Sequence, residues 1–309
     1  MNVTALLGLG QTALELGLIC ALTVLALFLS YSMLNVCDLS TDGCFTLGAA
    51  VGAAVAIGGH PYLAIPAAMG AGVLSGFAAA LLQTRMGVDS LLAGIIVNTG
   101  LYSINIAVMG GAAQLNLNKT ETVFTKMKAL LDGTALAGQY KLAVAVIAVG
   151  LVVAFLTFFL NTRLGLSIRA TGNNPDMVRS SSIDPVFTTT VGLCVANAFT
   201  GLSGCLLSQS QKSVSIDIGS GMLTIALASL LIGRTLLGRG GIFTRAVGMV
   251  LGSFAFRLVY TVALRFHMPA YMLKLVSSVI VVLAIFIPYL TSRQALLRRM
   301  AQGRKGGEA

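Results

Sequence analysis

The segment NTRLGLSIRATGNNPDMVRSSSIDPV, residues 161–186, is the longest polar interruption in the C-terminal half of the chain. Apolar runs flank it on both sides, at residues 140–160 and 187–207. Each run has about the 20 residues that a helix needs to cross a membrane. The segment therefore predicts a loop between two spans, and its arginines favour the cytoplasmic side of the membrane.

Within this loop, residues 175–182 predict a short helix. Pro175 suits the first turn, Asp176 suits the positive end of the helix dipole, and Asn173 or Asn174 can cap the N-terminus. A capped helix at the membrane surface favours docking onto a soluble partner. The alternative, which composition alone favours, is an ordinary basic cytoplasmic loop.

The composition indicates an all-α, polytopic transmembrane bundle. Of the 309 residues, 56% are hydrophobic and only 10% are charged, and the mean hydropathy is +0.90. Soluble domains carry about 25% charged residues. The net charge of +10 is explained by the loops of a membrane protein, so we expect lipid rather than nucleic acid as a partner. The five cysteines lack metal-site spacing, and we expect no metal.

The apolar runs predict a single transmembrane domain over residues 1–309, with about eight to ten spans and nine as the best match. The predicted spans are residues 12–34, 44–58, 62–84, 90–109, 140–160, 187–207, 221–232, 246–264 and 271–290. Run 44–58 is short and rich in glycine and alanine. It is either a full span or a re-entrant helix, which would reduce the count to eight.

The distribution of positive charge predicts the topology. If the basic tail at residues 291–309 is cytoplasmic, the loops on that side hold Arg85, Arg163, Arg169, Arg179, Arg234, Arg239 and Arg245. The outer loops then hold fewer basic residues, Lys119, Lys126, Lys128, Lys141 and Lys212. The positive-inside rule favours this orientation. With nine spans the N-terminus lies outside, whereas a re-entrant run 44–58 would place it inside.

Polar side chains inside or beside the apolar runs are candidates for a translocation pathway. They are Asp38, Asp42, Asn98, Asn105, Asn197 and Arg257. Each has a structural alternative. The aspartates suit a helix cap or a vestibule, and the asparagines suit hydrogen bonds between helices. The favoured alternative for Arg257 is an ion pair with Glu15 or Asp217, or snorkelling to the membrane surface.

The sequence argues against catalysis by this chain. It has no phosphate-binding loop ending in GK[ST], no HExxH motif and no GxSxG motif. The chain therefore cannot hydrolyse ATP itself, and a membrane-embedded enzyme is disfavoured. Few acidic residues lie within the predicted spans, so a proton relay is not evident.

Several stretches resemble permease subunits of bacterial ABC importers in the branched-chain amino acid and ribose permease superfamily, with the tryptophan/tyrosine permease branch as the most similar. The stretches are DLSTDGCFTLGAAVGA at residues 38–53, DSLLAGIIVNTGLYSINIAVMGG at 89–111, GLSIRATGNNPDMVRSSSID at 165–184, DIGSGMLTIALASLLIG at 217–233 and FRLVYTVALR at 256–265. The classical EAA-G loop of other ABC importers is absent.

The resemblance implies that residues 161–186 contain a coupling helix that docks on a separate cytoplasmic ATPase. The residues assigned to this role are Arg169, Gly172, Asn174, Pro175, Asp176, Arg179 and Ile183. Ser182 departs from the family pattern, which often has glycine there. The resemblance also implies a bacterial inner-membrane location, a second permease copy and an extracytoplasmic substrate-binding protein. ATP is then used by the partner subunit, and this chain binds no cofactor.

The sequence therefore favours an importer of a small polar solute, with an aromatic amino acid as the first expectation. A sugar or nucleoside permease of the same superfamily is the first alternative. The second is a secondary transporter driven by an ion gradient. We expect such a transporter to show inverted repeats and paired charges near the membrane centre, and the sequence shows neither.

Overall fold

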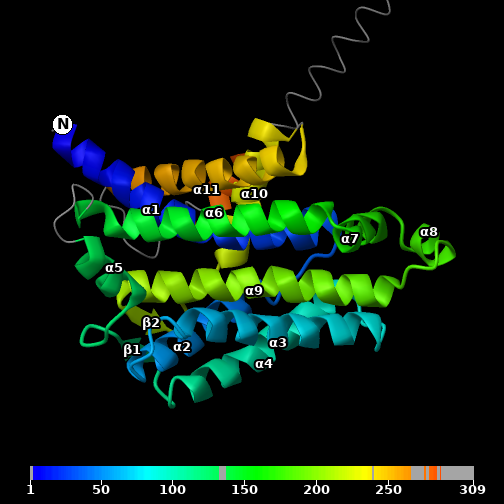
Figure 1. The fold of residues 1–309 in the computed structure, drawn as a ribbon, viewed down its shortest axis with the longest axis horizontal. Helices are drawn as coiled ribbons and strands as arrows, with labels where there is room; N and C mark the ends of the chain where they lie inside the picture. Colours follow the sequence, from blue (N-terminus) through cyan, green and yellow to red (C-terminus); the bar gives the residue numbers. More distant parts are fainter. Residues whose placement is uncertain are drawn as a thin grey trace, which may run out of the picture.

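The computed structural model describes residues 3–131, 137–238 and 240–265, together with residues 275, 278–283 and 286. The described chain is a bundle of helices with one two-stranded sheet, which confirms the all-α prediction (Figure 1). Six of its helices are long and apolar enough to cross a membrane, and α2 and α10 are shorter apolar helices. The basic tail and Arg239 fall outside these residues, and the predicted ninth span is described only at residues 275, 278–283 and 286.

The elements follow one another closely along the chain. In order they are α1 (Val3–Leu27), the π-helical turn η1 (Phe28–Met33), α2 (Thr41–Ile57), α3 (Ala64–Thr84), α4 (Ser90–Val108), β1 (Gln114–Asn116), α5 (Val123–Leu131), η2 (Ala137–Gln139), α6 (Tyr140–Asn161), α7 (Arg163–Asn173), α8 (Pro175–Ser180), α9 (Pro185–Gln211), β2 (Ser213–Ser215), α10 (Met222–Leu237) and α11 (Ile242–Arg265).

The connections gather at two opposite ends of the bundle. At one end lie α7, α8, the turn before α4, the last turn of α10 and the first turn of α11, and these hold every described arginine that the sequence assigned to the inner loops. At the other end, β1 pairs with β2, α5 lies beside α9, and the chain enters α1 (Figure 1). The five loop lysines lie at this second end. The two charge sets are therefore separated by the length of the bundle.

The segment of residues 34–57, which ends with α2, runs through the bundle and does not return to the end from which it starts. The chain reaches the α7 end at η1, where the carbonyl of Met33 lies against Gly172 so closely that a Cβ would not fit. It then rises through the irregular residues 34–40 and continues as α2. After α2, Tyr62 lies under Lys126 of α5, with 5.7 Å between the ammonium and the ring centre. The segment thus runs from one end of the described bundle to the other, which favours the full-span alternative over a re-entrant helix.

Two short helices meet near the centre of the bundle. The carboxylate of Asp38, just before α2, accepts a hydrogen bond from Asn197 Nδ2 at 2.8 Å, halfway along α9. One turn later, Asp42 accepts the backbone N–H groups of Gly221 at 2.9 Å and Leu223 at 2.7 Å. Asp42 of α2 thus caps α10. The N-termini of α2 and α10 face each other, and the helices run to opposite ends.

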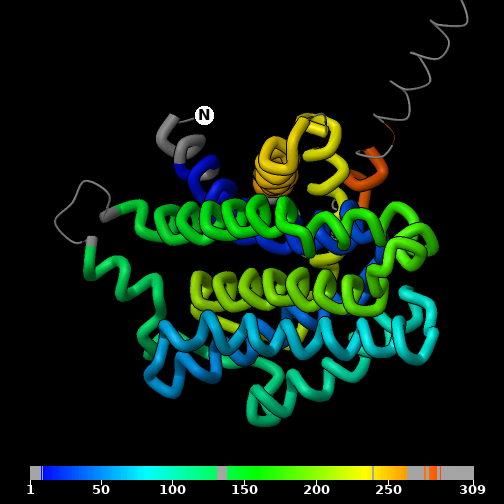
Figure 2. The backbone as a smooth tube through the Cα atoms, turned by 45° about the vertical axis from the view of Figure 1, so that its right-hand side comes forward, coloured from blue at the N-terminus to red at the C-terminus, as the bar shows by residue number. Residues whose placement is uncertain are grey.

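The packing around these short helices is repeated with inverted direction. Helix α3 lies along α9 (Figure 2), and α11 packs against α1. In both cases the short helix, α2 or α10, packs against the following long helix. The matched helices of the two sets run in opposite directions through the bundle. The structure therefore contains an inverted repeat that the sequence pattern did not reveal. The sequence argument against a secondary transporter, which relied on the lack of such a repeat, therefore no longer holds.

Glycines allow the central helices to approach one another closely. Gly48 on α2 packs on Gly201 of α9, and Gly72 on α3 packs on the carbonyl of Asn197. On the other half, Gly233 of α10 packs on Gly248 of α11. A Cβ at any of these positions would meet backbone atoms. This accounts for the high glycine content, because small residues are what permits close helix contacts within a membrane.

Candidate translocation pathway and coupling surface

The loop of residues 161–186 forms two helices at the arginine-rich end of the bundle. The expected short helix is α8, with Pro175 in its first turn. The Asn174 side chain caps it by accepting the N–H groups of Asp176 and Met177, both at 3.1 Å. The local prediction is confirmed, with Asn174 rather than Asn173 as the cap. The sequence reasoning missed α7, which Thr162 caps through the N–H of Gly165 at 3.2 Å.

Ser182 explains how α8 ends. Its φ of 59° lies in the left-handed region, where a glycine is favoured because it has no Cβ. The N–H of Ser182 donates to the carbonyl of Arg179 at 3.2 Å, and the N–H of Ile183 donates to that of Val178, also at 3.2 Å. These bonds close the last turn of the helix. Ser182, at a position where the family often has glycine, thus adopts a backbone conformation that is typical of glycine.

Buried contacts anchor α7 and α8 to the spans. Ile168 and Val178 are fully or almost fully buried. Thr171 of α7 and Thr188 of α9 share a hydrogen bond of 2.8 Å between their hydroxyl groups. Together with the contact of Gly172 on η1, these interactions join α7 to both α1 and α9. A displacement of α7 would therefore be transmitted to two long helices of the bundle.

The outer side of α7 and α8 is open and carries polar side chains together with the exposed apolar side chains of Leu166 and Met177. Asn174, Pro175, Asp176 and Arg179 are exposed, while Arg169 and Ile183 are half-buried. Arg179 pairs with Asp176 across one turn at 3.6 Å. Both partners of this ion pair face solvent, so it contributes little to stability. The seven residues predicted for coupling thus lie on one short segment, with some members exposed and others holding it to the bundle.

Three of the six predicted pathway residues line one polar cavity between α2, α4 and the segment that leads into α10. The cavity has a volume of about 440 Å³. Asp42, Asn98 and Asn105 contribute to its wall, with Tyr102, Ser103 and Asp217 among the other lining residues. Among the described residues that line it, none is a lysine or an arginine. The charged groups of the cavity wall are therefore carboxylates, which accept hydrogen bonds.

Asn105 adds an unused acceptor to this cavity. Its side chain is 1% exposed, and its Nδ2 donates to the carbonyl of Gly43 at 3.2 Å. Its Oδ1 is buried and has no hydrogen-bond partner within the described chain. A buried acceptor without a partner is costly. A solute that donates a hydrogen bond here would remove that cost.

Asp38 and Asn197 do not line this cavity; they bond to each other within the bundle. Both are 2% exposed. Asp38 also accepts the N–H of Ser40 at 2.8 Å, which fixes the turn into α2. The position of these two residues fits the helix-capping and interhelical alternatives that we considered for them.

Arg257 lies apart from the cavity, between α11 and α1. Its guanidinium donates to the thiol sulfur of Cys20 at 3.0 Å and lies 5.4 Å from the ring centre of Tyr260. Within the described residues, no carboxylate lies within ion-pair distance of it. The expected pairing with Glu15 or Asp217 is wrong. Glu15 accepts from Gln11 instead, and Asp217 lines the polar cavity.

The sequence reasoning did not select Asp217, Tyr102 or Ser103 for the pathway. Asp217 follows the strand β2 in an irregular stretch, so hydropathy assigns it to an outer loop. The structure shows that residues 216–221 return into the bundle before α10 begins. The signal in the sequence was the acidic DIGSG stretch directly before a short apolar run, which is the pattern of a broken span.

Residues 11–285 match the model of a protein family described as the branched-chain amino acid transport system permease component. This chain belongs to that family. The match covers all the described helices except the first turns of α1, so α7, α8 and the polar cavity all lie within the family region. The fold is accordingly that of an ABC-type, multi-pass membrane permease of the branched-chain amino acid and ribose superfamily.

Relatives of this permease differ in the transport systems for which they are named. A tyrosine transport system permease protein of Clostridioides difficile (strain R20291) is 28% identical over 86% of each chain. A D-allose transport system permease protein of Escherichia coli (strain K12) is 33% identical over 33% of each chain. A nucleoside ABC transporter permease of Lactococcus lactis is 26% identical over 50% of this chain and 47% of its own. No solved structure matches the chain.

Proposed function

We propose that this permease is the membrane subunit of a bacterial ABC importer for an amino acid, with an aromatic amino acid as the first candidate. A separate ATPase binds and hydrolyses ATP and docks on α7 and α8. A second permease copy completes the membrane unit, and an extracytoplasmic binding protein delivers the solute. The chain lies in the plasma membrane with the α7 end and the C-terminus in the cytoplasm.

The observation that carries this proposal is the coupling segment at the arginine-rich end. It presents an exposed face with charged and polar side chains, and its buried face contacts η1 at Met33 and α9 at Thr188. The positive-inside rule places this end in the cytoplasm, where an ATPase has access to it. Transmission of a docking motion requires an element linked to both sites. Helix α7 has that position.

The acidic cavity favours an amino acid over a sugar phosphate or any other anion. Asp217 and Asp42 are its charged groups, and Asp42 already accepts two backbone N–H groups of α10. Asp217 has an exposed side chain on the cavity wall. Its carboxylate suits the ammonium group of an amino acid, with the Oδ1 of Asn105 as a second acceptor. The similarity to a tyrosine transport system permease, over 86% of each chain, supports the same substrate class.

The coupling role is tested by co-purification of the tagged chain from membranes. We expect the native chain to bring down an ATPase, and Arg169→Glu with Arg179→Glu to lose it, because charge reversal changes the exposed face of α7 and α8. Lys119→Glu with Lys128→Glu reverses the same number of charges at the opposite end and should retain the ATPase. If the native chain is isolated alone and transports solute in cells that keep an ion gradient but lack ATP, it is a secondary transporter.

The substrate class is tested by uptake assays with Asp217→Asn. We expect tyrosine uptake to fall at least about tenfold, since the charge-assisted bond to the ammonium is worth roughly 1.5–3 kcal/mol. Asp89→Asn changes an exposed carboxylate at the other end, outside residues 161–186, to a side chain that can still cap α4, and should leave uptake unchanged. If the native chain takes up D-allose or a nucleoside, and Asp217→Asn does not change that uptake, the sugar or nucleoside alternative is indicated. That result would leave the coupling role intact.

A further inference from the structure

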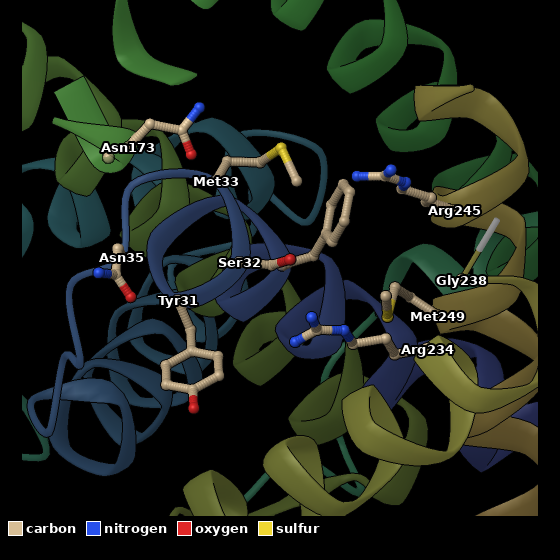
Figure 3. Close-up of a pocket in the computed structure, with 11 residues that line it drawn as sticks. Tyr31, Ser32, Met33, Asn35, Asn173, Arg234, Gly238, Arg245 and Met249 are labelled. Atoms are coloured by element: carbon tan, nitrogen blue, oxygen red, sulfur yellow. The ribbon is translucent and has the colours of Figure 1, made fainter. Parts of the chain in front are cut away.

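A second polar cavity lies at the arginine-rich end, between η1, α7, α10 and α11. Its volume is about 460 Å³. Figure 3 shows Arg234 and Arg245 projecting from the α10 and α11 side toward the chain segment that carries Ser32 and Met33. Asn35 and Asn173 complete the polar wall. This cavity shares no lining residue with the cavity that contains Asp217 and lies at the opposite end of α10 from it.

The positive charge of this cavity has no counter-charge in the described chain. None of its lining residues is acidic. No carboxylate lies within 4.0 Å of either guanidinium among the described residues. The Nε of Arg245 is buried and has no hydrogen-bond partner there. A buried N–H of a charged group without an acceptor is costly, so the site is suited to an anionic acceptor.

The surroundings of the cavity indicate where the anion comes from. Exposed apolar side chains lie on the same helices close to the two arginines: Leu236 of α10 is 57% exposed and Phe243 of α11 is 58% exposed. Tyr31 of η1, on the cavity wall, is 38% exposed. Tyrosine is typical of the membrane–water interface. The arginines thus lie where the lipid-facing surface ends, at the level of the lipid headgroups.

We propose that this cavity binds the phosphate of an anionic phospholipid. The guanidinium groups of Arg234 and Arg245 bind the phosphate oxygens, since guanidinium geometry matches phosphate. Ser32, Asn35 and Asn173 lie within the same cavity as neutral hydrogen-bonding groups for the headgroup hydroxyls. Basic pockets between membrane helices bind acidic lipid headgroups in this manner. Because α7 forms one wall, the bound lipid links the coupling segment to α10 and α11.

The proposal is tested by native mass spectrometry of the full chain extracted from bilayers of phosphatidylglycerol and phosphatidylcholine. We expect the native chain to retain phosphatidylglycerol selectively. Arg234→Gln with Arg245→Gln should reduce that retention roughly 10- to 30-fold, from about 1 kcal/mol per basic residue. Arg85→Gln with Arg163→Gln removes the same charge at the same end outside the cavity and should change retention little.

Two further arms exclude misfolding and a soluble ligand. Arg234→Lys with Arg245→Lys keeps the charge and should restore most of the retention. Glycerol 1-phosphate should not raise the melting temperature of the chain in neutral detergent. Equal retention by the glutamine variant would overturn the proposal, and stabilisation by glycerol 1-phosphate alone would assign the site to a soluble phosphate. Loss of ATPase co-purification with unchanged lipid retention would make the cavity a protein-docking site.

Discussion

At the scale of single residues, the polar side chains of the spans divide by what they contact. Asp38, Asp42 and Asn197 accept or donate hydrogen bonds within the bundle at distances of 2.7–2.9 Å. Asp217 lines the polar cavity with an exposed side chain, and the buried Oδ1 of Asn105, on the same wall, has no hydrogen-bond partner among the described residues. The same residue types therefore serve two purposes, and Asp217 is the carboxylate on the cavity wall with an exposed side chain.

Asp42 provides a prediction about stability. Its carboxylate accepts two backbone N–H groups at the start of α10, so Asp42→Ala leaves both without an acceptor. We expect a loss of about 2–3 kcal/mol, measured by unfolding in mixed detergent micelles. Asp89→Ala removes a cap that accepts one N–H at the exposed start of α4 and should cost about 1 kcal/mol or less. Equal losses would show that Asp42 does not join α2 to α10.

At the scale of elements, close helix packing determines the arrangement. Helix α9 is largely buried because α1, α2 and α3 all pack on it, and glycines form much of the contact. Helices α4 and α6 lie at the periphery and expose apolar side chains along much of their length. Hydropathy alone does not separate these two groups, because lipid-facing and buried helices are equally apolar.

Two glycines on α3 test this packing. Gly72 lies against the carbonyl of Asn197 in α9, so Gly72→Ala forces the two helices apart. We expect a loss of about 1–3 kcal/mol in the free energy of unfolding. Gly70 lies on the same helix with open space at its Cβ position, and Gly70→Ala should be neutral or slightly stabilising. A similar response at both positions would contradict the α3–α9 contact.

At the scale of the whole molecule, charge and topology agree. The described inner-loop arginines lie at the α7 end and the loop lysines lie at the opposite end, where α1 begins. The inverted arrangement of α1–α3 and α9–α11 surrounds the junction of α2 and α10. The polar cavity lies at this junction, which is where transporters with broken helices place their substrate sites.

The orientation is tested by labelling single cysteines with a membrane-impermeant maleimide after replacement of the five native cysteines by alanine. Lys119→Cys, on the exposed connection between β1 and α5, should react in intact spheroplasts. Ser181→Cys, exposed after α8, should react only after lysis. The reverse pattern would place the α7 end outside the cell and exclude docking of a cytoplasmic ATPase there.

The sequence by itself determined the membrane class, the long spans, the capped helix α8 and the separation of arginines from lysines. These features depend on local composition, on the residues next to a helix end and on loop charge. The family resemblance, now supported by the match over residues 11–285, rests on the same stretches.

Only the tertiary structure decided which polar residues share a cavity, that Asp42 caps α10, that Arg257 contacts Cys20 and that the two halves are inverted. Each of these joins residues that are far apart in the chain, such as Asp42 and Leu223. Apolar periodicity carries little information about them, because every span of a membrane protein is apolar on most faces. The contacts follow from which helices approach closely, and steric fit between distant glycines and backbone atoms determines that.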